Sequence, residues 1–405
     1  MGIDEALVAS DGMGGRGWAG FRLAPVLGGP PAHQHTGLTT TELEARVAAD
    51  ESAWLSSLWS AAAGGSGRFE IRYRNDPSAP GGSNGRPHLL RCACLCRAEG
   101  TTTDEAASSA ITLRDRLAVG LPSHVRAESM TGTDELYNWL VPFEAPDWER
   151  GQAEIAKALT CRPVGRRHPR QNAIAAVSRY SARRVPWEPA LRRLAELPFP
   201  AVLTVGVMPF PRSEPFRYGL EQLAADYDEL AQPVRAVAVY GGAVPGDEFA
   251  QYAAERGKMA ARQYYQGPAF RLRISLAATR PLPDDLPTWI AEALSGGTAD
   301  PEARAVARGP APDDRYEAWR NFTSIGAVWM PATYLGPVPE HVVAPELREL
   351  LNLADLAEAG SAVQLPVAWP GRPQLYAEYS APAPPSPDDF FGGGPQRSKT
   401  SDSTL

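Results

Sequence analysis

Lysine is nearly absent from this chain of 405 residues. Only Lys157, Lys258 and Lys399 are lysines among 40 basic residues, whereas glycine and proline number 37 and 39. This composition is typical of a high-GC genome, and we expect an actinobacterial source. Positive charge therefore rests on arginine, whose planar guanidinium binds carboxylates and phosphates through paired hydrogen bonds.

Long apolar runs are also missing. The longest, at residues 201–210, has about ten residues, and a membrane-spanning helix needs about twenty. The first residues, MGIDEALVAS, carry two acidic side chains and no basic ones, unlike a secretory signal. The sequence therefore predicts a cytoplasmic protein with no membrane span.

The motifs of phosphate-binding and zinc enzymes are lacking too. A phosphate-binding P-loop requires Gly-x4-Gly-Lys followed by Ser or Thr, but the only Gly-Lys pair, Gly257-Lys258, precedes Met259. The zinc-binding pattern His-Glu-x-x-His does not occur. These absences exclude a P-loop ATPase and the common zinc-hydrolase arrangement.

Two glycine patterns match the residue spacing of functional motifs but lack the flanking elements that those motifs require. The stretch 12–17 reads Gly-x-Gly-x-x-Gly but lacks the helix that would meet a dinucleotide pyrophosphate. The stretch 81–85 reads Gly-x-Ser-x-Gly within a loop, whereas a nucleophilic serine needs a strand-to-helix turn. We therefore predict no catalytic, cofactor-binding or metal-binding residue and no cofactor, and expect a protein that is not an enzyme. An enzyme with an unrecognised site is the alternative.

Cysteine is scarce and unevenly placed. Cys92, Cys94 and Cys96 alternate along one predicted strand, and Cys161 stands apart. Side chains two residues apart on a strand are about 6.6–6.8 Å apart, which is too far for three thiolates on one zinc ion. We predict that these three cysteines are small buried apolar side chains.

The length and the net charge limit the number of domains and the classes of protein that the sequence allows. At about 100–200 residues per domain, 405 residues suggest two domains. The net charge of −7 argues against a protein that wraps nucleic acid over its whole surface.

Two long strands dominate the first half. In RFEIRYR, Phe69, Ile71 and Tyr73 alternate with charged residues, which predicts one buried and one solvated sheet face. LLRCACLCR reads as the antiparallel return strand. Helices are expected at 39–63 and 102–119, the second opened by a Thr-x-x-Glu capping box.

Strand and helix segments recur in the second half, around 201–210 and 269–279. The sequence therefore predicts an α+β fold of two units, each a mixed or mostly antiparallel sheet packed with helices, with a pseudo-repeat. The expected divisions are a Gly/Pro-rich arm at 1–38, an α+β domain at 39–150, an Arg-rich linker at 151–195, a second α+β domain at 196–380 and a disordered tail at 381–405.

Positive charge is concentrated between residues 160 and 193. This window holds nine arginines and one glutamate, a charge of 9 − 1 = +8, which leaves −15 for the rest of the chain. It is either a solvated segment paired with the acidic remainder, or a surface that binds nucleic acid or an acidic partner. The candidate contact residues are Arg162, Arg166, Arg167, Arg170, Arg179, Arg183 and Arg184.

The order of several segments resembles a known family. RFEIRYRNDP, HLLRCACLCRAEGTTTDEAASSAITLRDRL, WEPALRRLAELPFPAVLTVGVMPFP, AFRLRISLAAT and NLADLAEAGSAVQLPVAWPG are similar to the region preceding the motor in HerA-like, conjugation-type ATPases of the HerA/FtsK superfamily. The likeness covers about residues 40–370. In that family a RecA-like motor follows the apolar-Leu-Pro segment, here residues 363–366, whereas this chain continues with AEYSAPAPPSPDD.

The resemblance implies a detached, non-catalytic accessory or scaffold subunit. It would pair with a separately encoded HerA-like P-loop ATPase in DNA translocation, conjugal transfer or phage defence, and could assemble as an oligomer. The alternatives are a nucleic-acid-binding module that uses the Arg-rich segment, and the enzyme named above.

Overall fold

The computed structural model describes residues 5–10, 14–26, 39–61, 67–77, 89–235, 243–326, 343–369 and 372–377. The chain combines helices with a large antiparallel sheet, which confirms the predicted α+β class. The loop at 81–85 and the tail at 381–405 lie outside the described residues.

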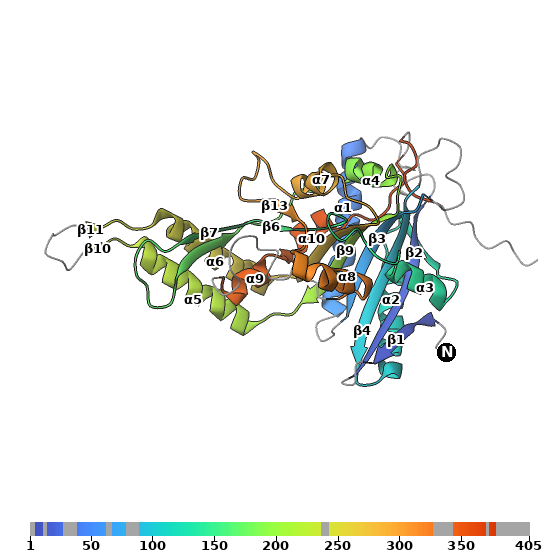
Figure 1. Cartoon of the computed structure of the whole chain (residues 1–405), viewed down its shortest axis with the longest axis horizontal. Coiled ribbons are helices and arrows are strands. Elements are labelled where there is room, and N and C mark those ends of the chain that lie inside the picture. The colour runs from blue at the N-terminus through green and yellow to red at the C-terminus, as the bar shows by residue number, and fades with distance from the viewer. Residues whose placement is uncertain are drawn as a thin grey trace, which may run out of the picture.

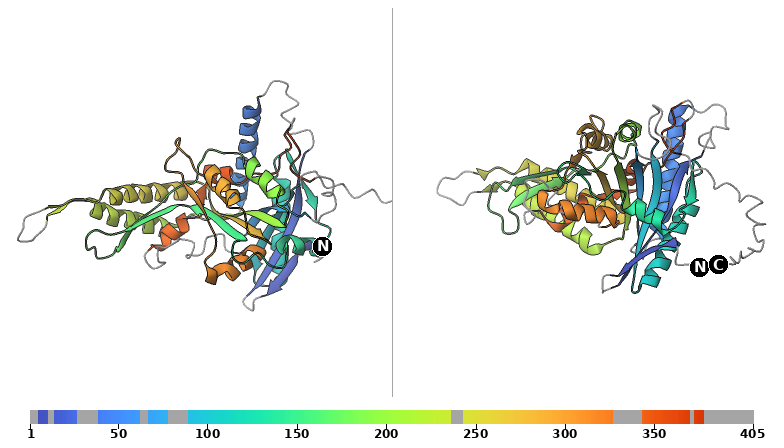
Figure 2. Two further views of the ribbon diagram at one scale, coloured as in Figure 1. Left: turned by 45° about the horizontal axis from the view of Figure 1, so that its top comes forward. Right: turned by 45° about the vertical axis from the view of Figure 1, so that its right-hand side comes forward.

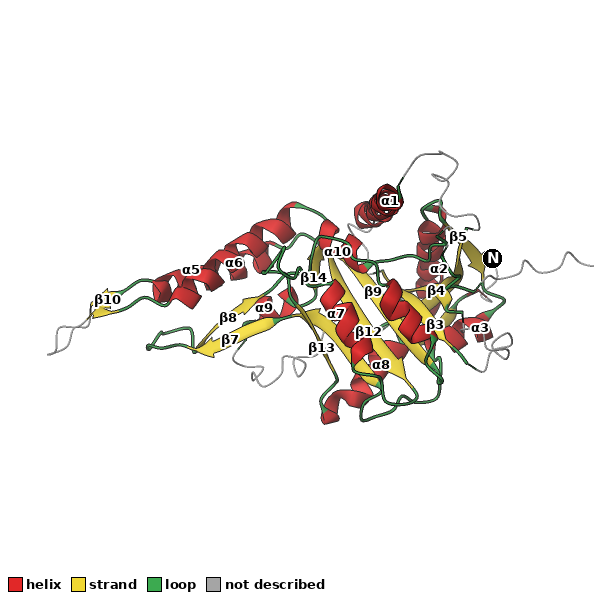
Figure 3. Cartoon of the chain, turned by 90° about the horizontal axis from the view of Figure 1, so that it is seen from above, coloured by secondary structure: helices red, strands yellow, loops and turns green. Residues whose placement is uncertain are grey.

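One sheet runs through the whole core (Figure 3). Its strands follow the order β1-β2-β4-β3-β9-β12-β6-β13, while β5 also pairs with β2 and β14 with β12. Their bounds are β1 (Leu7–Ser10), β2 (Gly15–Pro25), β3 (Arg68–Asn75), β4 (Arg91–Gly100), β5 (Val125–Ser129), β6 (Gln152–Lys157), β9 (Ala201–Phe210), β12 (Ala269–Ala278), β13 (Ala305–Arg308) and β14 (Leu353–Asp355).

The sheet consists of two units with the same topology. The first runs β2, α1 (Thr40–Ala61), β3, β4, α2 (Thr103–Val119) and β5, with strand order β5-β2-β4-β3. The second runs β6, α4 (Glu188–Ala195), β9, β12, α7 (Asp285–Ala293) and β13, with strand order β13-β6-β12-β9. Each is a β-α-β-β-α-β ferredoxin-like unit, so the pseudo-repeat predicted from the sequence is present.

The two units share hydrogen bonds along their adjoining edges. Strand β3 of the first unit pairs antiparallel with β9 of the second, from Phe69 opposite Val207 to Asn75 opposite Ala201. The expected linker at 151–195 is therefore not a linker, because it supplies β6, the hairpin β7 (Leu159–Pro163) and β8 (Ala173–Val177), and α4. The many arginines of this segment indicated its charge, but they did not indicate which strands and residues it pairs with.

The expected arm at 1–38 also differs from the structure, because residues 15–25 form β2 between β4 and the edge strands β1 and β5. Glycine lowers strand propensity and obscured this strand in the sequence. Gly17 is needed there because a Cβ would lie 2.3 Å from the carbonyl oxygen of Ala106 in α2. Gly17, one of the glycines that resembled a dinucleotide motif, thus allows α2 to approach β2 closely.

Helices cover both faces of the sheet. On one face, α1, α2, α4, α7 and α10 (Leu356–Ala362) pack against the apolar side chains of both units in a continuous core. On the other face, α3 (Thr133–Leu140) and α8 (Arg315–Thr323) contribute Trp139, Trp319 and Phe322 to smaller clusters. The face of RFEIRYR predicted to be solvated is therefore buried.

Charged side chains on this second face are paired. Arg72 is fully buried, and its guanidinium donates to the Glu70 carboxylate at 2.9 Å and to the carbonyls of Trp139 and Leu140 at 2.6 and 2.9 Å. The Arg273 guanidinium on β12 donates to Glu154 of β6 at 3.0 Å. Burial lowers the pKa of Arg72, an effect that Glu70 opposes.

A two-helix arm projects from the second unit between β9 and β12. Helices α5 (Glu214–Ala231) and α6 (Glu248–Gln266) extend side by side away from the sheet in every view (Figures 1 and 2). The β7–β8 hairpin lies along them, and β10 (Val234–Arg235) pairs with β11 (Ala243–Val244) at the tip. The arm has its own apolar core, which α9 (Pro345–Leu350) completes.

We expect Arg72→Met to destabilise the protein by about 3–5 kcal/mol, because it leaves buried Glu70 without its cationic partner. The free energy of unfolding from denaturant titration measures the loss. The control is Arg126→Met, which removes an ion pair from a side chain that is 44% exposed and should cost less than about 1 kcal/mol. Equal losses for the two variants would contradict a central role for the buried pair.

Candidate functional site

The candidate arginines lie in three separate places, one of which holds Arg179 alone, just after β8 and bridged to Ala303. Arg162, Arg166, Arg167 and Arg170 belong to the β7–β8 hairpin along the arm, whereas Arg183 and Arg184 precede α4 beside the core. The structure does not bring all seven together.

Most arginines of the arm contact other residues of the same chain. Arg162 forms an ion pair with Asp247, the N-cap of α6, and packs over the Phe249 ring at 4.6 Å. Arg170 pairs with Asp226 of α5. The Arg166 guanidinium donates to carbonyl oxygens at the C-terminal end of α5. These contacts attach the hairpin to the helices.

Two further candidates also pair with acidic residues. Arg179 lies 2.9 Å from a carboxylate oxygen of Asp300, and Arg184 lies 2.6 Å from one of Glu51. Within the described ranges, no ion-pair partner is present for Arg167 or Arg183, both of which are exposed. The acidic remainder of the chain thus neutralises most of the Arg-rich window.

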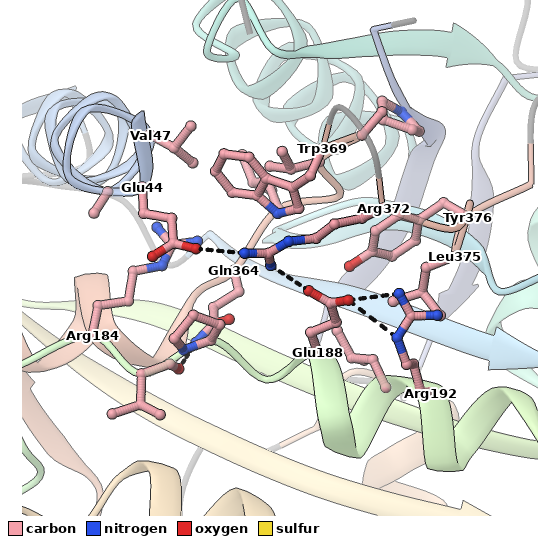
Figure 4. Close-up of a pocket in the computed structure, with 18 of the residues that line it drawn as sticks. Glu44, Val47, Arg184, Glu188, Arg192, Gln364, Trp369, Arg372, Leu375 and Tyr376 are labelled. Atoms are coloured by element: carbon pink, nitrogen blue, oxygen red, sulfur yellow. Dashed lines mark hydrogen bonds and ion pairs between the residues drawn. The ribbon is translucent and has the colours of Figure 1, made fainter. Parts of the chain in front are cut away.

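A cavity of about 410 Å³ lies between α1, α4 and the segment 364–376. It opens where helices of the two units approach each other (Figure 4). Apolar side chains such as Val47, Leu191 and Trp369 form part of its wall. Charged groups complete the lining, namely Arg183, Arg184, Arg192, Arg372, Glu44 and Glu188.

Arg372 connects the two units across this cavity. Its guanidinium donates to Glu188 of α4 at 2.6 Å and to Glu44 of α1 at 3.2 Å (Figure 4). Arg192 donates to the same Glu188 carboxylate at 2.6 Å. Partial burial raises the pKa of Glu188, but hydrogen bonds from the two arginines outweigh it, so the pKa lies below its usual value.

A buried carboxylate holds part of the cavity wall in position. Glu51 of α1 is fully buried and accepts hydrogen bonds from Arg184 at 2.6 Å and from the backbone N–H of Leu365 at 3.2 Å. The His124 ring nitrogen Nε2 lies 3.2 Å from the oxygen that accepts from Leu365, and Arg184 donates to the other oxygen. Glu51 therefore positions Arg184 and the chain segment that forms the cavity wall.

A second buried charge cluster lies at the base of the arm, and the sequence analysis did not identify it. Lys157 donates to the Tyr264 hydroxyl at 2.6 Å and to Glu358 at 3.0 Å. Burial lowers the pKa of Lys157, against the opposing effect of Glu358. The adjoining cavity of about 20 Å³ has room for about one water molecule. Because Tyr264 lies on α6 and its two partners lie on β6 and α10, this cluster joins the arm to the core. Asp355-x-x-Glu358, a capping box, was the sequence signal available.

The described residues contain neither a metal-binding cluster nor a helix that could span a membrane. There, no three His, Cys, Asp or Glu side chains are grouped to hold a metal ion. Across the same ranges, no helix combines the length and apolar character required to cross a bilayer.

No protein-family model matches the chain, and no curated protein matches it at a significant level.

The prediction of buried cysteines on β4 is confirmed, because Cys92, Cys94 and Cys96 are each 1% exposed. Burial raises the pKa of all three thiols, that of Cys96 to about 12. We expect a disulfide reagent at a pH of about 8 to modify only the half-buried Cys161 in the native protein, because thiolate is the reactive form. Counting modified thiols by mass spectrometry tests this.

All four cysteines should react in denaturant. Cys161→Ser should leave no reactive thiol in the native chain. Rapid modification of a cysteine on β4 would contradict the described burial.

The arrangement of the arginines also predicts weak binding to DNA. Of the seven candidates, only Arg167 and Arg183 lack a described ion pair or a described hydrogen bond from the guanidinium, since Arg166 donates to backbone carbonyls. The binding constant falls with salt by a slope of about 0.9 per phosphate contact. We expect a slope of about two or less for a short duplex, measured by fluorescence anisotropy. Replacing Arg166, Arg167, Arg183 and Arg184 with Gln should change the affinity for the duplex little. A steep slope that these substitutions abolish would instead favour a nucleic-acid-binding segment.

Proposed function

We propose that this chain is a cytoplasmic, non-catalytic accessory or scaffold subunit. It pairs with a separately encoded HerA-like P-loop ATPase, in DNA translocation, conjugal transfer or phage defence. The proposal rests on the order of its segments, which resembles the region preceding the motor in that family. It also rests on one structural observation, the projecting arm.

The arm distinguishes two otherwise matching units. In the first unit, β3 and β4 are joined by residues 76–90; in the second, β9 and β12 are joined by residues 211–268, which hold α5 and α6. An insertion of this size on a rigid sheet is typical of an element that carries a binding function. The asymmetry supports a role for the arm in contacting a partner.

The surface of α6 supports the same role. Tyr252 and Met259 are 39% and 49% exposed, and seven residues apart they share one helix face. Aromatic and methionine side chains are enriched in protein–protein interfaces. We assign this face, the α6 face formed by Tyr252 and Met259, as the contact surface for the ATPase.

Co-expression with a HerA-like ATPase encoded beside this gene tests the proposal. The tagged chain should retain the ATPase through affinity purification and gel filtration. Tyr252→Ser with Met259→Ser should lower retention at least about tenfold, because the substituted face loses its apolar contacts.

The matched control is Tyr137→Ser with Tyr316→Ser. These side chains are 54% and 70% exposed on the core helices α3 and α8, so the control pair should leave retention unchanged. Absence of any retained ATPase, or turnover of nucleotide by the purified chain alone, would refute the proposed function.

A further inference from the structure

The cavity between α1 and α4 carries positive charge that the described residues do not fully neutralise. Arg192 and Arg372 are bound by Glu188 and Glu44, and Arg184 by Glu51. Arg183 is exposed, and the described part of the chain supplies no ion-pair partner for it. The rim therefore presents the unpaired charge of Arg183 next to an apolar interior, while the adjacent Arg184 is held by Glu51.

The size and wall of the cavity suit a peptide. Its volume of about 410 Å³ lies within the range of about 300–1,000 Å³ found for ligand pockets. Trp369 and Val367 supply apolar surface, and Leu191 of α4 lies on the opposite wall. An occupant should therefore combine carboxylates with apolar or aromatic side chains.

The chain contains such a segment a short distance along the sequence from the cavity wall. Tyr376 lines the cavity, and the backbone N–H of Ala377 donates to Leu90 at 2.8 Å. Residues 388–391 read Asp-Asp-Phe-Phe and follow Ala377 by about eleven residues, a span that can reach about 36 Å when extended.

We propose that the cavity is a binding site for an acidic aromatic peptide and that its occupant is the chain's own segment 388–391. The carboxylates of the segment pair with Arg183 at the rim, where charged hydrogen bonds are strong. The two phenyl rings occupy the apolar interior beside Trp369. The covalent tether raises the local concentration of the segment, which favours occupancy without high intrinsic affinity. This proposal does not depend on the ATPase partner.

A labelled peptide covering residues 383–395 tests the proposal by competition. It is titrated, with fluorescence anisotropy as the readout, into the full wild-type chain and into the full chain carrying Phe390→Ser and Phe391→Ser. The substituted chain should bind the peptide at least about tenfold more tightly, because its own segment no longer competes. Equal affinities for the two chains would overturn the proposal.

Two charge reversals in the Phe390→Ser, Phe391→Ser chain locate the site. Arg183→Glu should weaken binding of the peptide at least about tenfold, because it repels the two carboxylates. The matched control, Arg167→Glu, changes an exposed arginine on the arm and should have no effect. Equal effects of the two reversals would show a nonspecific charge interaction and overturn the assignment.

Further titrations separate the peptide from other anions. A peptide with Asp388→Asn and Asp389→Asn should bind at least about tenfold more weakly. Inorganic phosphate at the same ionic strength should not displace the labelled peptide beyond a salt control. A chain that binds phosphate and fails to bind the peptide would identify a small-anion site and overturn the proposal.

Discussion

The buried, paired arginines on one face of the sheet connect its strands to the helices that cover that face. Arg72 connects Glu70 to the carbonyl groups at the end of α3, and Arg68 and Arg97 donate to carbonyls just beyond the end of α8. The carbonyls of Trp139 and Leu140 lie in the last turn of α3, where the helix itself supplies no N–H donor, so Arg72 satisfies them. An unpaired buried charge is costly, so the second face of the sheet is stable only while α3 and α8 are in place.

Two equivalent units diverge where their connections differ. The same strand order and the shared β3–β9 edge give a continuous sheet, and the helices on its apolar face form one core. The first unit is compact, whereas the second extends into α5 and α6. Lys157, paired with Glu358, joins the base of that extension to the core. The strands and helices that the two units share form a rigid sheet. The insertion of α5 and α6, which only the second unit has, adds exposed surface.

The Arg-rich window illustrates why charge counts alone do not define a binding site. Its excess of arginine was evident from the sequence, and the choice between a paired segment and a binding surface depended on acidic residues far away in the chain. Asp247 and Asp300 lie 85 and 121 residues from the arginines that they contact. Likewise, the cavity wall combines residues from α1 with Arg372, which lies 328 residues from Glu44. Spacing along the chain cannot reveal such a site.

Local patterns were sufficient for the class of fold and for several elements. Thr102 caps α2 as predicted, where its hydroxyl accepts from the Glu105 N–H, because this contact is confined to one turn. The reciprocal half of the predicted capping box differs, since the Glu105 carboxylate accepts from the N–H of Thr101. The alternation of RFEIRYR likewise identified a strand, since side-chain direction depends only on the backbone. It did not reveal that both faces are covered, because α8 lies more than 200 residues later. The sequence by itself determined several of the elements and the two-unit α+β pattern. Tertiary structure alone decided which charges are buried and paired, because burial depends on neighbours distant in the chain.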